Sequence, residues 1–63
     1  MRYRAYLSDA NGKWGDDLEL ADVPVENSVV TDSQGRRFRV THILDVPVGY
    51  DGALVADQVR DDI

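Results

Sequence analysis

The sequence predicts a small, mainly β domain, either an antiparallel sheet or an SH3-like half-open barrel of four to five strands. Three observations support this fold class. Apolar and polar residues alternate with a period of two in several short segments. Turn sequences such as Asn11-Gly12 and Asp51-Gly52 separate these segments at short intervals. Helical periodicity is confined to the C-terminal tail.

The first two strands are expected to form a hairpin. Residues 2–8 alternate between apolar and polar side chains, and Asn11-Gly12 follows as a strong hairpin signal. The second strand should then begin near Lys13 or Trp14, with Gly15 marking a bulge or bend. The residues expected on the inner face of the first strand are Tyr3, Ala5 and Leu7.

The middle of the chain predicts a second hairpin. Residues 17–21 alternate again, and residues 23–25 form an expected extended connector because proline disfavours a helix before it. Two further strands are predicted at residues 28–31 and 36–46, joined by a type I turn at residues 32–35. This hairpin resembles the central hairpin of SH3-like barrels.

The tail, residues 53–63, fits two structures. Its apolar residues recur at the spacing of a helix, and Ala, Leu, Gln and Arg are fair helix formers, so we expect a short C-terminal helix capped near Asp51. Alternation over residues 53–59 also fits a strand. The helix would make the fold α+β rather than all-β.

Composition limits what the chain can be. It has 63 residues and a mass of 7.1 kDa, which predicts one small domain, residues 1–63, without a deep catalytic cavity. It contains no cysteine, so disulfides and thiolate metal sites are excluded. No apolar run approaches the length of a membrane span, and no signal-peptide pattern opens the sequence. We therefore expect a cytoplasmic protein that does not bind membranes.

Catalysis and metal binding have little support. The only histidine, His42, falls by period two on the apolar face of residues 36–46, where a half-buried structural role is expected. The pairs Asp16-Asp17 and Asp61-Asp62 lack the oxygen-ligand spacing of a calcium loop. None of the serines lies in a nucleophile motif, and the glycines match no phosphate-binding loop. We expect no enzyme activity, no metal and no cofactor.

Charge gives the most informative pattern. Twelve acids against seven bases give a net charge of −5, which repels nucleic acid and favours a protein partner with a basic surface. Residues 16–26 hold five acids and no base. An array of carboxylates on a rigid sheet would imitate the phosphates that a basic groove holds. With the sole tryptophan as a candidate anchor, the expected partner-binding residues are Trp14, Asp16, Asp17, Glu19, Asp22, Glu26, Asp57 and Asp61.

The arginines suggest an alternative. Arg2 and Arg4 on one strand and Arg37 and Arg39 on another would share a face if the two strands were neighbours. Arginines beside aromatic residues are typical of single-strand nucleic-acid binders, so a weak nucleic-acid binder stays open as a hypothesis. A small SH3-like structural or adaptor module of a larger assembly, such as a phage particle, is another.

In size, acidity, missing catalytic groups and β-rich character, the chain resembles the small acidic inhibitors that phages and mobile elements encode, including anti-CRISPR proteins and DNA mimics. The resemblance is to a class, and no motif carries it. It implies a target with a basic nucleic-acid-binding surface in a host defence complex, blocked by steric and electrostatic occlusion. Both a monomer and a homodimer are compatible with the sequence. The hypothesis requires a continuous negative patch containing Asp17 and Glu19 without neighbouring arginines.

Overall fold

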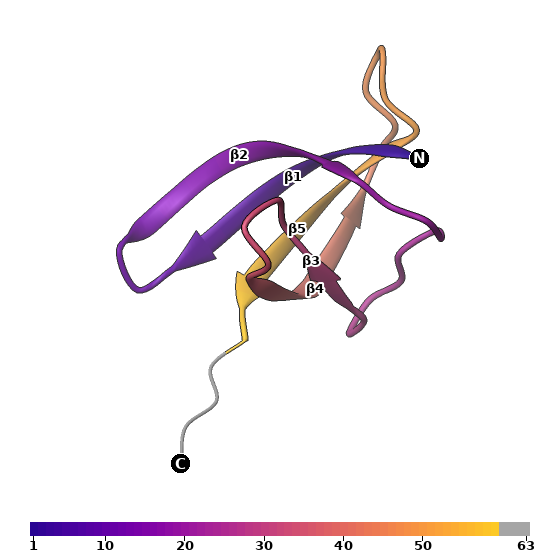
Figure 1. The fold of residues 1–63 in the computed structure, drawn as a ribbon. Helices are drawn as coiled ribbons and strands as arrows, with labels where there is room; N and C mark the ends of the chain where they lie inside the picture. Colours follow the sequence, from indigo (N-terminus) through magenta and orange to yellow (C-terminus); the bar gives the residue numbers. More distant parts are fainter. Residues whose placement is uncertain (60–63) are drawn as a thin grey trace.

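The chain forms one mixed five-stranded sheet that curls into a half-barrel (Figure 1). This computed structural model describes residues 1–59. The part of the chain that it describes contains no helix, and hence none that could span a membrane. The predicted small, mainly β half-open barrel is confirmed. The strands are β1 (Arg2–Asp9), β2 (Gly12–Glu19), β3 (Val29–Thr31), β4 (Arg37–Leu44) and β5 (Gly52–Gln58).

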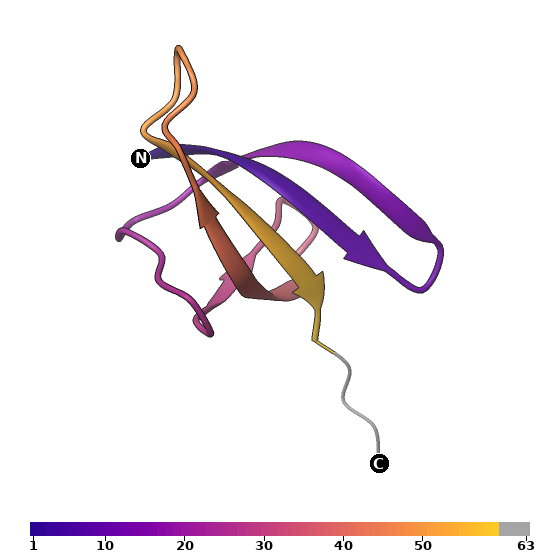
Figure 2. The same ribbon diagram turned by 180° about the vertical axis from the view of Figure 1, so that it is seen from behind.

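The sheet is mixed, which corrects the expectation of an antiparallel sheet. Its strand order is β2-β1-β5-β4-β3. The hairpins β1–β2 and β3–β4 are both antiparallel, as is the pair β4–β5. β5 returns from β4 to lie beside β1 and runs parallel to it. Figure 2 shows β5 between β1 and β4, where it joins the two hairpins into one sheet.

The expected C-terminal helix is wrong for residues 52–58, which form β5 instead. β5 is a central strand with hydrogen-bonded neighbours on both sides. Leu54 and Ala56 are fully buried in the core, and Ala53 is buried on the other face. Pairing with two neighbours overrides the modest helix preference of the segment, because strand preference depends mainly on such surroundings. The rest of the tail, residues 60–63, lies outside the described residues.

The core lies on the inner, concave face of the sheet. Phe38 and Val40 of β4 are fully buried there, as predicted from the alternation of that strand. Trp14 of β2 packs against this core at its edge, with its ring edge-to-face to that of Phe38 and 6.0 Å between centroids. The other buried members of the cluster are Tyr3, Ala5, Leu7, Leu18, Val30, Leu54 and Ala56.

A β-bulge in β4 changes which side chains are buried. The register with β5 shifts between Val40 and His42, so Thr41 is an extra residue in the strand. Thr41 donates a hydrogen bond from its hydroxyl to the carbonyl of Val55, 3.1 Å away. Beyond the bulge the alternation is reversed, and His42 lies exposed on the outer face. The prediction of a half-buried His42 on the apolar face is therefore wrong.

The two turns around β2 and β5 also differ from expectation. β2 pairs with β1 without any register shift, so the bulge expected at Gly15 is absent. Between β4 and β5 the turn is not at Asp51-Gly52. It lies at residues 47–50, where the amide of Tyr50 donates to the carbonyl of Pro47 and Gly49 has φ 87°. This is the geometry of a type II turn with glycine at its third position.

Gly52 is required for packing rather than for a turn. It pairs with Tyr3 across β1 and β5, and the tyrosine ring covers it. A Cβ atom at residue 52 would lie 2.5 Å from Cε2 of Tyr3. The buried ring therefore occupies the volume that any side chain at this position needs.

We expect Gly52→Ala to lower the free energy of unfolding by about 1–3 kcal/mol, the usual range for overpacking a core. Urea denaturation at pH 7 measures the change. The control is the same substitution in a Tyr3→Leu background, where the ring is gone and the added methyl group should cost less. An equal loss in both backgrounds would contradict the proposed clash.

Candidate binding surfaces

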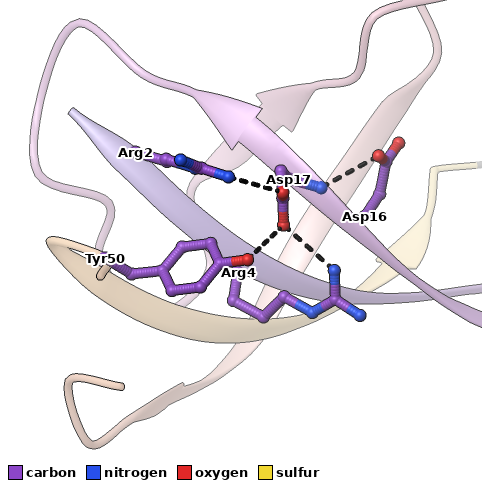
Figure 3. Close-up of polar contacts among 5 residues, drawn as sticks. All are labelled: Arg2, Arg4, Asp16, Asp17 and Tyr50. Carbon is purple, nitrogen blue, oxygen red and sulfur yellow. Dashed lines mark hydrogen bonds and ion pairs between the residues drawn. The ribbon is translucent and has the colours of Figure 1, made fainter. Parts of the chain in front are cut away.

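Asp17 is the centre of a polar network on the outer face of the sheet (Figure 3). Its Oδ2 accepts a hydrogen bond from Arg2 Nη2 at 3.1 Å, and its Oδ1 accepts one from Arg4 Nη1 at 3.0 Å. Oδ1 also accepts a hydrogen bond from the hydroxyl of Tyr50 at 2.8 Å. The guanidinium of Arg2 lies 5.0 Å from the centroid of the Tyr50 ring. One carboxylate thus connects β2, β1 and the β4–β5 loop.

The register of the first hairpin creates this network. Asp9 pairs with Gly12, so the turn is Ala10-Asn11, one residue earlier than the Asn11-Gly12 signal suggests. This register sets Asp17 directly opposite Arg4. Gly15, the next residue on the same face of β2, has no side chain, and the Arg4 guanidinium occupies the space that a Cβ would need.

The hydrogen bonds and charges of the network lower the pKa of its carboxyl group. Hydrogen bonds from Tyr50, then Arg4 and Arg2, lower the pKa of Asp17 from 3.8 to about 2. The same carboxylate raises the pKa of both arginines, chiefly through these hydrogen bonds. Asp17 is therefore ionised at any physiological pH, and its charge is balanced within the molecule.

This pairing contradicts one expectation from the sequence. Asp17 and Glu19 do share the outer face of β2, as the alternation predicts. They do not form a negative patch free of arginines, because Asp17 lies between Arg2 and Arg4. Glu19 is exposed, and its Oε1 lies 3.4 Å from the α-amino group of Met1. The expected continuous negative patch without neighbouring arginines is therefore wrong at Asp17.

Asp16 points away from this network. As the neighbour of Asp17 in a strand, it projects to the opposite face, in the register of the buried Ala5. Its Oδ1 accepts a hydrogen bond from the Asp17 amide at 2.9 Å (Figure 3). The two carboxylates do not converge on a common point. Over residues 1–59, no group of three or more acidic or histidine side chains is placed to hold a metal ion.

Trp14 also has internal partners. Besides its contact with Phe38, its ring faces the guanidinium of Arg36 at 5.1 Å. Arg36 is itself held by the buried carboxylate of Asp32, with 2.8 Å between Nη2 and Oδ2. Burial tends to raise the pKa of Asp32, but hydrogen bonds from Arg36 and the amide of Gln34 outweigh it and lower the pKa. Trp14 borders only a shallow pocket of about 290 Å³.

The arginines expected to form a nucleic-acid-binding face have intramolecular partners. Arg2 and Arg4 pair with Asp17, and Arg39 donates to the carbonyl of Asn27 at 3.1 Å. β1 and β4 share the outer face but are separated by β5. On β5, Asp57 lies opposite Arg39 and accepts a hydrogen bond from the hydroxyl of Ser8. Asp61, the last of the expected binding residues, lies outside the described residues.

The remaining two acids lie on the connector between β2 and β3. Asp22 and Glu26 are exposed, and over residues 1–59 neither forms an ion pair. Val23 and Val25 lie between them and are 65% and 61% exposed. Pro24, between the two valines, is buried. We call residues 22–26 the acidic–apolar loop.

A groove runs between this loop and β3. It has a volume of about 340 Å³ and occupies the open seam of the half-barrel, where the end of β2 approaches β3. Its walls carry two acids, Glu19 and Asp22, and no basic residue. The other residues along it are Leu20, Ala21, Val23, Pro24, Ser28, Val29, Val30 and Thr31.

The β4–β5 loop presents a second exposed surface. It projects from the end of the sheet (Figure 1), with Val48 fully exposed at its tip and Val46 67% exposed beside it. Its base is fixed to β1, because the Arg2 amide donates to Asp51 Oδ2 and the Asp51 amide donates to the Arg2 carbonyl, both at 2.8 Å. Tyr50 adds its bond to Asp17. The loop is thus held at its base, while Val48 at its tip is fully exposed.

Comparison with known proteins gives no relative: no protein-family model, curated protein or solved structure matches the chain.

The Asp17 network should make stability depend on pH. Because folding lowers the pKa of Asp17 from 3.8 to about 2, its stabilising effect is complete above the unfolded value and is lost as pH falls towards 2. We expect Asp17→Asn to be less stable than the wild type at pH 7, with the difference shrinking below pH 4 and mostly lost at pH 2.

Urea denaturation at pH 7, 4 and 2 measures this difference in the free energy of unfolding. Asp45→Asn is the control, since Asp45 is exposed and has no part in the network. A difference between wild type and Asp17→Asn that stays constant over the whole range would show that the charge of Asp17 does not matter.

Proposed function

We propose that this protein is a non-enzymatic binding domain that occupies a basic surface of a partner protein through the acidic–apolar loop. The observation that carries the proposal is the pair Asp22 and Glu26, which are exposed and unpaired by cations over the described residues, on either side of two exposed valines. Interfaces commonly combine an apolar centre with a charged rim. The loop has this composition.

Asp22 and Glu26 differ from the three acids of the described residues that form ion pairs, Asp17, Glu19 and Asp32. Asp17 and Asp32 have their charges balanced by arginines, and Glu19 lies beside the α-amino group. Charges without an internal partner contribute most to attraction of an oppositely charged surface, and this attraction weakens as salt rises. Of the expected binding residues, Asp22 and Glu26 therefore support the proposal best.

For the partner, we keep the class that the resemblance implies: a protein of a host defence complex, of the CRISPR type, whose basic groove holds nucleic acid. Net charge supports this choice, because a chain at −5 is attracted to such a groove and repelled by the nucleic acid itself. The proposed mechanism is steric and electrostatic occlusion. It differs from the first expectation in using the loop beside β3 and not the outer face of β2.

The test compares two variants with the same change of charge. Asp22→Lys alters the loop, and Asp45→Lys alters an exposed acid on the β4–β5 loop. Each wild-type or variant protein is used as bait in lysate of the cells that encode the proposed target. We expect one captured protein to be lost with Asp22→Lys, retained with Asp45→Lys, and released by added nucleic acid or by 0.5 M salt.

Equal capture by both variants would contradict a role for the loop. Capture that resists salt and nucleic acid would favour an apolar interface, as expected of an adaptor module. Retention of the protein itself on a DNA column, lost after Arg39→Ala, would favour the nucleic-acid binder.

A second surface, the tip of the β4–β5 loop, is favoured by one observation: Val48 is fully exposed on a loop whose base is held by hydrogen bonds to β1. A pre-organised loop loses little conformational entropy on binding, and exposed apolar side chains often mark contacts. We expect Val48→Ser to leave stability unchanged within about 0.5 kcal/mol, as is usual for surface substitutions. Loss of the captured protein with Val48→Ser, and not with Asp22→Lys, would assign binding to this tip.

A further inference from the structure

We propose that the partner contributes an extended segment of alternating basic and apolar residues, which pairs with the free edge of β3 and fills the open seam of the half-barrel. This inference rests on the proposed function, and it specifies which chemical feature of the partner is bound. Three observations support it: the free backbone groups of β3, the groove beside them and the charge of its walls.

The backbone of β3 has one free edge. The amide of Val40 donates a hydrogen bond to the carbonyl of Ser28, and the amide of Asp32 donates one to the carbonyl of Arg36. In this register the even-numbered residues from 28 to 32 therefore direct their backbone groups towards the strand that contains β4. The amides and carbonyls of alternate residues in a strand point to opposite edges. The groups of Val29 and Thr31 therefore point away from β4, and over residues 1–59 no backbone partner meets them.

The groove lies along this free edge. Val29 and Thr31 line one wall, and residues 19–24 form the other, so the free amides face a space of about 340 Å³. The opposite wall includes the end of β2, the other edge strand of the sheet. A strand added here would extend the sheet beyond β3 and approach β2, which would close the barrel. Strand addition of this kind gains affinity from main-chain hydrogen bonds.

The faces of the seam define the side chains of the added strand. Val30 belongs to the core face of β3 and Leu20 packs against the same core, so residues on that face should be apolar. Glu19 belongs to the outer face, as its pairing with Arg2 shows, and Asp22 lies on the same wall of the groove. Residues on the outer face of the added strand should therefore be basic. The result is an alternating Lys-Val or Arg-Val pattern.

The probe is the peptide acetyl-Lys-Val-Lys-Val-Lys-amide, titrated into the 15N-labelled protein and followed by NMR. We expect the amide signals of Val29 and Thr31 to shift and their hydrogen exchange to slow, with smaller effects at the tip of the β4–β5 loop. A peptide with Glu in place of Lys should bind at least about tenfold more weakly because the walls of the groove are acidic.

Two methylated peptides test the backbone pairing. One carries N-methyl groups on its valines and the other on its lysines. Because alternate amides of a strand point to opposite edges, only one set can donate to β3. We expect one methylated peptide to lose about tenfold in affinity or more, in line with one or two lost hydrogen bonds, and the other to bind nearly as the parent does. Equal effects of both would overturn strand addition.

A variant of the protein tests the same bonds from the other side. Thr31→Pro removes an amide that points away from β4, and proline is tolerated on an edge strand at such positions. Thr31→Val keeps the amide and is the matched control. We expect Thr31→Pro to weaken the peptide about tenfold and Thr31→Val to leave its affinity unchanged. The methylated peptides decide the matter if Thr31→Pro does not fold.

The outcomes separate this inference from the proposed function. If Asp22→Lys abolishes capture of the partner while Thr31→Pro and the methylated peptides have no effect, the loop binds but no strand is added. If the peptide adds to β3 while capture is indifferent to Asp22→Lys, the seam accepts strands but the proposed partner surface is wrong.

Discussion

The pairing of β5 with both β1 and β4 is the constraint on which the rest of this fold depends. The other four strands form two hairpins, and within the described residues β5 is the strand that pairs with both of them. The chain contains no disulfide, and no helix covers the sheet within the described residues, so the core must come from the curvature of the sheet alone. Leu54 and Ala56 supply the centre of that core from β5, and Gly52 of the same strand lets the ring of Tyr3 pack closely.

The same constraint explains why some acids cannot serve for recognition. The loop that leads into β5 must be positioned beside β1, and Asp17, Tyr50 and Arg2 do this on the outer face. Three hydrogen bonds, from Arg2, Arg4 and Tyr50, thus engage the Asp17 carboxylate within the molecule. A carboxylate in the sequence is therefore not always available to a partner. The net charge of the chain overstates the number of carboxylates that are.

The sequence was sufficient for the strands with regular alternation and clear turns. β1 and most of β4 follow from period two, and β2 follows from the turn that precedes it, although it is continuous through Gly15. Gly35, with φ 82°, is the positive-φ residue of the predicted turn before β4. Two local events could not be read from it. The bulge at Thr41 reverses the alternation of β4, and it depends on the register with β5, a partner distant in sequence. The first turn lies one residue earlier than its Asn-Gly signal, which changes the residue opposite Arg4 to Asp17.

The candidate site was harder to predict for the same reason. Five acids between residues 16 and 26 look alike in sequence, yet pairing across the hairpin neutralises Asp17, while Asp22 lies on a connector with no strand opposite. The groove also depends on a contact between segments distant in the sheet, because it forms where the end of β2 approaches β3. Neither the composition nor the alternation of any one segment contains that information.

The two edge strands, β2 and β3, differ in the number of charged residues that they carry. Proteins commonly protect exposed edges with charged residues, which prevents unwanted pairing between chains. β2 carries such residues along its length, including Lys13, Asp16 and Asp17. β3, with Val29, Val30 and Thr31, carries none. The acids near β3 lie across the groove, on Glu19 and Asp22, where they would repel an acidic strand and attract a basic one. The basic residues Arg37 and Arg39 lie on the other side of β3, on β4. The edge of β3 thus combines free backbone hydrogen-bonding groups with an acidic groove. This combination favours pairing with a basic strand, whereas the charged residues of β2 disfavour pairing with any strand.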